Sequence, residues 1–120
     1  MKKILIIEDE NELCDLLGLR LERGGFEVIV ANDGVEGLNK ARLEKPDLII
    51  LDLMLPKMHG EEVCKEVRRD ARISEVPIIM LTAKCTDADK VIGTVIGANV
   101  YIGKPFDGAK LMQAINKLLG

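Results

Sequence analysis

Acidic side chains follow two apolar runs of the sequence, at the points where buried strands should end. Glu8 and Asp9 come directly after Ile4–Ile7, and Asp52 comes directly after Leu48–Leu51. If these runs are neighbouring strands of a parallel sheet, their carboxyl ends open onto one crevice and the carboxylates meet there. Two carboxylates about 4 Å apart repel each other by about 4 kcal/mol at an effective dielectric constant of about 20. Such a cluster needs a cation, and hard oxygen ligands favour Mg²⁺.

A hydroxyl and an ammonium group follow two further apolar runs. Thr82 comes after Ile78–Leu81, and Lys104, with Pro105 behind it, comes after Val100–Ile102. The same strand geometry would carry both groups to the crevice. Carboxylates, a metal ion, a hydroxyl and a lysine in one place indicate a metal-assisted phosphoryl site.

Each residue of this set also has a simpler structural explanation when it is taken alone. Glu8, Asp9 and Glu10 could form a solvated helix N-terminus that the helix dipole favours. Asp52 could be a capped loop residue, although an unpaired carboxylate between Leu51 and Leu53 would be costly to bury. It is the set together that favours a functional site.

Composition narrows the classes of protein to which the chain can belong. Its 120 residues suit one domain over 1–120, and a hydrophobic fraction of 48% allows a packed core without disulfides. A net charge of −3 argues against a nucleic-acid surface. No apolar run approaches the roughly 18 residues of a membrane span. The odd number of widely spaced cysteines indicates a reduced, cytoplasmic setting. Whether the domain is free-standing or the first part of a longer protein stays open.

The elements that must position these groups alternate regularly along the chain. Apolar runs that read as strands are separated by segments of helical period, which predicts a parallel sheet covered on both faces. We therefore expect a doubly wound α/β domain with five strands and five helices. Gly93 and Gly97 weaken the helical pattern of the fourth helix. The strands are expected at Ile4–Ile7, Val28–Ala31, Asp47–Leu53, Ile78–Leu81 and Val100–Ile102, and the best-bounded helices at Asn11–Arg23 and Asp87–Ile96.

Four segments, in this order and spacing, resemble the signature of the response-regulator receiver domain. They are IIEDE at 6–10, DLIILDLMLP at 47–56, LTAK at 81–84 and KPF at 104–106. The resemblance spans the whole chain. It implies a flavodoxin-like fold with the sheet order 2-1-3-4-5. It also implies a bacterial two-component pathway, in which a histidine kinase donates phosphate to an aspartate.

The resemblance assigns a role to each residue of the cluster. Asp52 would be the phosphoacceptor that forms an acyl phosphate. Asp9 and Asp52 would bind Mg²⁺ with the backbone carbonyl of Met54, and Glu8 would act through a metal-bound water. Lys104 would pair with the acceptor and then with the phosphoryl group. The chain would thus be a phosphoacceptor switch and not an enzyme acting on other substrates.

The switch itself is also implied by the resemblance. Thr82 would bond a phosphoryl oxygen and draw Tyr101 from an outward to an inward position. Pro105 would fix a turn that contains a cis bond in the family. The residues that tune attack by water on the acyl phosphate are Met54 and Lys84 here, which predicts a long-lived phosphoryl group.

The partners implied by the resemblance are a sensor histidine kinase or a phosphotransfer protein, and a downstream protein or fused output domain. Neither nucleic acid nor a membrane is expected as a direct partner. Winged-helix regulators in this family dimerise through charged pairs at positions that are Val100 and Ala114 here. This predicts a monomer.

Three rival functions can be weighed from the sequence. A haloacid-dehalogenase-type enzyme needs a second aspartate two residues after the nucleophile, where this chain has Met54. A flavin-binding carrier would need a phosphate-binding loop rich in Ser, Thr and Gly after the first strand. This chain has Glu8–Glu10 there, and these side chains would repel the flavin phosphate. A pseudo-receiver that only binds proteins would have no need of the acidic, threonine and lysine positions, all of which are present.

Overall fold

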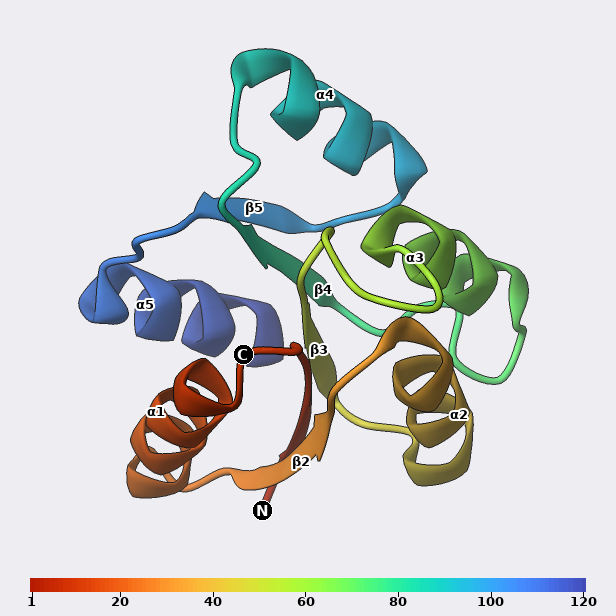
Figure 1. Cartoon of the computed structure of the whole chain (residues 1–120). Helices are drawn as coiled ribbons and strands as arrows, with labels where there is room; N and C mark the ends of the chain where they lie inside the picture. Colours follow the sequence, from red (N-terminus) through yellow and green to blue (C-terminus); the bar gives the residue numbers. More distant parts are fainter.

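Five strands alternate with five helices in the computed structural model, which describes residues 1–120 (Figure 1). The strands are β1 (Lys3–Ile7), β2 (Glu27–Ala31), β3 (Leu48–Leu51), β4 (Ile78–Thr82) and β5 (Val100–Gly103). The helices are α1 (Asn11–Arg23), α2 (Gly34–Glu44), α3 (Gly60–Arg69), α4 (Asp87–Ile96) and α5 (Gly108–Leu119).

The strands form one parallel sheet in the order β2-β1-β3-β4-β5. The chain moves outward from β1 to β2 and then returns to place β3 on the other side of β1, so the direction of winding reverses there. The register of β1 and β3 sets Ile7 opposite Leu51, and the two strands therefore end level with each other. Ligands of open α/β sheets bind beside such a reversal, at the carboxyl ends of the strands. The predicted flavodoxin-like fold is confirmed.

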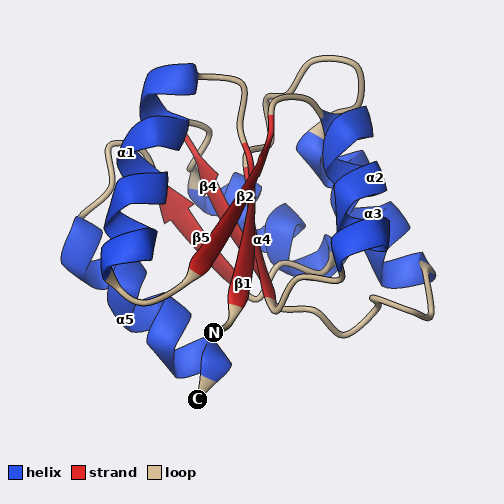
Figure 2. Ribbon diagram, turned by 90° about the horizontal axis from the view of Figure 1, so that it is seen from below, coloured by secondary structure: helices blue, strands red, loops and turns tan.

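Helices cover both faces of the sheet, as Figure 2 shows. Helices α1 and α5 lie on one face, and α2 and α3, with α4 beyond them, lie on the other. Side chains of β1 alternate between two cores: Ile4 and Ile6 point to the α1/α5 side, and Leu5 and Ile7 point to the α2/α3 side. Burial on both sides explains why the strands are continuous apolar runs rather than alternating ones.

The third strand is shorter than predicted, because it covers Leu48–Leu51 and not Asp47–Leu53. Before the strand, the Asp47 carboxylate accepts a hydrogen bond of 2.7 Å from the backbone amide of Lys3. After it, the chain folds back, and the amide of Gly60 donates to the carbonyl of Leu53 at 2.8 Å. Asp52 therefore begins a loop and does not lie within a strand.

The helices agree more closely with the sequence. Helices α1 and α4 have the predicted bounds. Helix α4 is regular to Ile96 despite Gly93, and a Thr86–Asp89 capping box holds its start. Gly97 serves as its left-handed cap, with φ of 119°. None of the helices combines the length and apolar character needed to cross a membrane.

Candidate functional site

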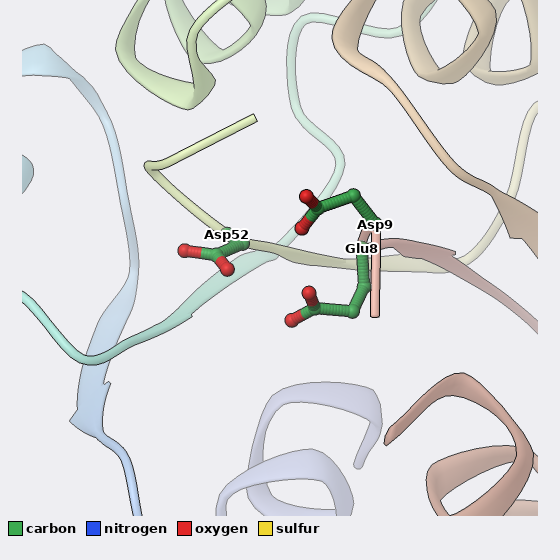
Figure 3. Close-up of side chains that lie close together, drawn as sticks. All are labelled: Glu8, Asp9 and Asp52. Atoms are coloured by element: carbon green, nitrogen blue, oxygen red, sulfur yellow. The ribbon is translucent and has the colours of Figure 1, made fainter. Parts of the chain in front are cut away.

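Glu8, Asp9 and Asp52 bring their carboxylates together at the carboxyl ends of β1 and β3 (Figure 3). One oxygen from each side chain lies within 4.8 Å of the other two. Glu8 and Asp52 are buried, with 3% and 5% of their surface exposed, whereas Asp9 is exposed. The cluster predicted from the strand ends is therefore present, and it has one side open to solvent.

Lys104 reaches this cluster from the end of β5. Its Nζ lies 2.6 Å from Oε1 of Glu8 and 2.9 Å from Oδ2 of Asp52, with Glu10 at 3.8 Å. The backbone positions the side chain, because the Lys104 amide donates to the Thr82 carbonyl at 2.9 Å. The following peptide bond to Pro105 is cis, as the resemblance implied. The resemblance implied that Lys104 pairs with the acceptor Asp52, and nothing in the sequence indicated its direct ion pair with Glu8.

The surroundings of these groups set their protonation. Burial acts to raise the pKa of Asp52, but hydrogen bonds from Lys104 and from the Thr82 hydroxyl outweigh it and lower the pKa. Burial raises the pKa of Glu8, and the hydrogen bond from Lys104 offsets this only in part. Burial alone would lower the pKa of Lys104, yet its hydrogen bonds to Glu8 and Asp52 raise it. Asp52 is thus held as a carboxylate beside a protonated lysine.

The cluster keeps an excess of negative charge after this pairing. By formal charge, three carboxylates and one ammonium sum to −2. An exposed carboxylate from Asp9 faces the open side, so a divalent cation could enter and balance the remaining charge. The chemistry of the donor set, all of it carboxylate oxygen, fits Mg²⁺.

Thr82 and Tyr101 are linked through the backbone of Lys84. Thr82 is fully buried at the end of β4, and its hydroxyl accepts a hydrogen bond of 3.3 Å from the amide of Lys84. The hydroxyl of Tyr101 donates to the carbonyl of the same residue. The ring of Tyr101 is half-buried. Burial raises the pKa of its hydroxyl to about 12, so the side chain is uncharged at neutral pH.

Other predicted residues lie around the open side of the cluster. Met54 is 63% exposed, and together with Lys84, His59 and Asp9 it lines a depression beside the carboxylates. The amide of Met54 donates to Oδ1 of Asp52 at 3.1 Å. His59 is exposed and stands at the N-cap of α3.

A family model described as the response regulator receiver domain matches residues 4–116. The chain belongs to this family. Among curated relatives, the alkaline phosphatase synthesis transcriptional regulatory protein PhoP of Bacillus subtilis is 48% identical over 118 residues, which cover 98% of this chain and 48% of that protein. The chain spans about half the length of the curated relatives it matches.

Solved structures of receiver domains superpose closely on this one. The Vibrio cholerae chemotaxis protein CheY4 is 34% identical, has a TM-score of 0.92 and is covered to 99% in each chain. The receiver domain of the Pseudomonas aeruginosa sensor histidine kinase PA1611, with a magnesium ion coordinated in its active-site cleft, is 29% identical. Its TM-score is 0.91, over 99% of this chain and 98% of that one.

Membership in the receiver family decides between the rival functions that the sequence left open. The domain is of the kind found in two-component response regulators, so phosphorelay signalling is its function class. The dehalogenase-type enzyme and the flavin carrier are set aside. A pseudo-receiver is also disfavoured. Such a module would have no use for a charged cluster that is costly to maintain, and this chain gathers one in a single crevice from Glu8, Asp9, Asp52 and Lys104.

Proposed function

We propose that residues 1–120 form a receiver domain that accepts a phosphoryl group on Asp52 from the phosphohistidine of a sensor histidine kinase or a phosphotransfer protein. An oxygen of the Asp52 carboxylate attacks phosphorus and a P–O bond forms. The P–N bond to the donor imidazole breaks, and its electron pair stays on the imidazole nitrogen, which takes up a proton. The product is an acyl phosphate.

One observation carries this proposal: the buried Asp52 carboxylate is held 2.9 Å from the Lys104 ammonium, at the edge of a carboxylate cluster. Hydrogen bonds lower its pKa, so Asp52 is available as an ionised nucleophile at neutral pH. Lys104 would move its interaction from the free carboxylate to the phosphoryl oxygens, as a compact charge can. Thr82 would bond a phosphoryl oxygen.

We further propose that Mg²⁺ binds to Asp9, Asp52 and the backbone carbonyl of Met54, with Glu8 acting through a bound water. The carbonyl of Met54 accepts no backbone hydrogen bond and is free to serve as a ligand. When bound, the ion would neutralise charge on the transferring phosphoryl group. Magnesium in the cleft of the PA1611 receiver domain supports the same choice of metal here.

The acyl phosphate would act as a switch. The domain would catalyse only its own phosphorylation and dephosphorylation, and Thr82 and Tyr101 would pass the change to a downstream protein or a fused output domain. We propose that this phosphoryl transfer takes place in the cytoplasm. The receiver would be a monomer and would make no direct contact with nucleic acid or a membrane. Its net charge of −3 supports the absence of nucleic-acid contacts.

Incubation with acetyl phosphate and Mg²⁺, followed by intact mass measurement, tests the proposed function. The parent should gain the mass of one phosphoryl group, and the increment should be lost on mild base or hydroxylamine treatment. Asp52→Asn should show no increment, whereas the exposed aspartate variant Asp15→Asn should behave as the parent does. An increment that persists in Asp52→Asn would refute the assignment of the acceptor.

A further inference from the structure

Helix α4 packs on the core through Ile96, which is partly buried, but the one residue that it buries fully has no side chain. Gly93 is the buried residue of this helix. Its apolar neighbours Val91, Ile92 and Val95 are instead exposed, to 63%, 49% and 80%. A glycine inside a helix costs about 0.5–1 kcal/mol relative to alanine. Helix formation therefore does not explain why a glycine stands at this position.

The reason is the ring of Tyr101, which lies directly against Gly93. A Cβ atom built on Gly93 would come 2.5 Å from Cδ2 and 2.7 Å from Cε2 of the ring. Carbon atoms in contact normally stand about 3.5–4.0 Å apart. Even a methyl group at this position would therefore exclude the ring from the place that it occupies.

The ring also lies at the end of a line of contacts that begins at the acceptor. The Thr82 hydroxyl, which bonds to Asp52, accepts from the Lys84 amide at 3.3 Å. The Lys84 carbonyl in turn accepts from the hydroxyl of Tyr101. The Cδ2–Cε2 edge of the same ring then lies against Gly93 of α4.

We propose that Gly93 is a positioning residue, a seat on α4 that admits the Tyr101 ring and couples the state of Asp52 to the position of this helix. The coupling rests on the proposed function of Asp52. With the ring seated, α4 packs closely on β5. With the ring outside, the helix loses the contact made by its buried residue. A phosphoryl group that favours one position of Thr82 would bias this equilibrium through its differential contacts with the two states.

The first test needs no phosphoryl group. Tyr101 is the one tyrosine and the chain has no tryptophan, so intrinsic tyrosine fluorescence reports on this ring alone. Gly93→Ala should raise the acrylamide quenching constant towards that of a free tyrosine amide. The matched control is Gly18→Ala in α1, where the added Cβ meets no atom closer than Val28 Cγ1 at 3.8 Å. The control should quench as the parent does.

A double-mutant cycle separates the seat from a general effect on folding. Gly93→Ala should lower the melting temperature in the parent, because the methyl group displaces the ring. In a Tyr101→Ala background the same change should raise the melting temperature, since alanine is the better helix former. Equal losses in the two backgrounds, or unchanged quenching in Gly93→Ala, would overturn the proposal.

The last measurement tests the coupling. Beryllofluoride with Mg²⁺ should reduce Tyr101 quenching in the parent. Gly93→Ala should still gain the phosphoryl mass from acetyl phosphate, but its quenching should no longer respond to beryllofluoride. A response equal to that of the parent would refute the coupling. If the parent gains no phosphoryl group, the proposed function and the coupling both fail, while the quenching and the double-mutant cycle still decide whether Gly93 seats the ring.

Discussion

The ammonium nitrogen of Lys104 lies 2.9 Å from Oδ2 of Asp52, although 52 positions separate the two residues in the sequence. The same nitrogen bonds Glu8 at 2.6 Å, across 96 positions. One lysine thus ties the ends of β1, β3 and β5 together. It also supplies the positive charge that faces a cluster of three carboxylates.

Removal of this lysine should destabilise the fold. We expect Lys104→Met to lower the free energy of unfolding by about 3 kcal/mol at pH 7, because two buried carboxylates lose their charge partner. Urea unfolding without divalent cations measures the loss. Lys110→Met, which removes an exposed lysine, is the matched control. A loss as large in Lys110→Met would show that the pairing at the cluster is not the cause.

Magnesium should stabilise the folded domain. The cluster retains a formal charge of −2 after pairing, and a ligand that binds only the native state adds to its stability by mass action. At a Mg²⁺ concentration about 100 times Kd the gain should be about 2.7 kcal/mol. Melting curves with and without MgCl₂ measure it. An equal gain in the Asp9→Ala/Asp52→Ala double mutant would contradict binding at this site.

The end of α3 should show a dependence of stability on pH. Hydrogen bonds from Arg72 and Arg42 hold the pKa of Asp70 well below its ordinary value of 3.8. A carboxyl group with a depressed native pKa stabilises the fold above its unfolded pKa, and this contribution is lost as the pH falls towards the native value. Asp70→Asn should therefore lower the urea midpoint at pH 7, and its difference from the parent should shrink below about pH 4. With Asp15→Asn as the control, a difference that stays constant with pH would contradict this origin.

The acyl phosphate should be long-lived because of two side chains at the open side of the cluster. Met54 cannot orient or activate a water, and Lys84, which lines the same depression, can shield the phosphoryl group. Replacing them together, Met54→Asn with Lys84→Glu, should speed loss of the phosphoryl group by about tenfold, or about 1.4 kcal/mol in the barrier. Loss of the mass increment with time measures the rate. No change in rate would mean that these residues do not shield the group.

The convergence of the acidic cluster could be predicted from the sequence, because parallel strands leave little freedom at their ends. Apolar runs that end in Glu8, Asp9 and Asp52 must open onto one crevice once β1 and β3 are neighbours. The sequence alone could not predict which of the carboxylates would pair with Lys104. Adjacent side chains leave a strand end in different directions, and the structure buries Glu8 while Asp9 stays exposed.

The end of β3 and the role of Gly93 could not be predicted for a different reason. Both depend on contacts between segments distant in the sequence. The strand ends at Leu51 because Gly60 bonds back to Leu53, and an apolar run alone gives no sign of that turn. In the sequence, Gly93 only weakens a helical pattern. Its contact with the ring of Tyr101 is seen only in the folded structure.

The last prediction concerns the face formed by α4, β5 and α5. Val100 and Ala114 occupy the positions where winged-helix receivers carry the acidic residue and the arginine of their dimer contact, and here both side chains pack partly into the α1/α5 core. They cannot form an ion pair across a two-fold axis. On α4, Val91 and Val95 are exposed, so the face is more apolar than a surface built on charged pairs.

We expect the beryllofluoride-activated domain to stay monomeric and to offer this face to a different protein. Light scattering over a range of protein concentrations measures the mass. A tight two-fold dimer that Val95→Glu disrupts, while a charge placed on α1 by Leu19→Glu does not, would show that the face pairs with itself instead.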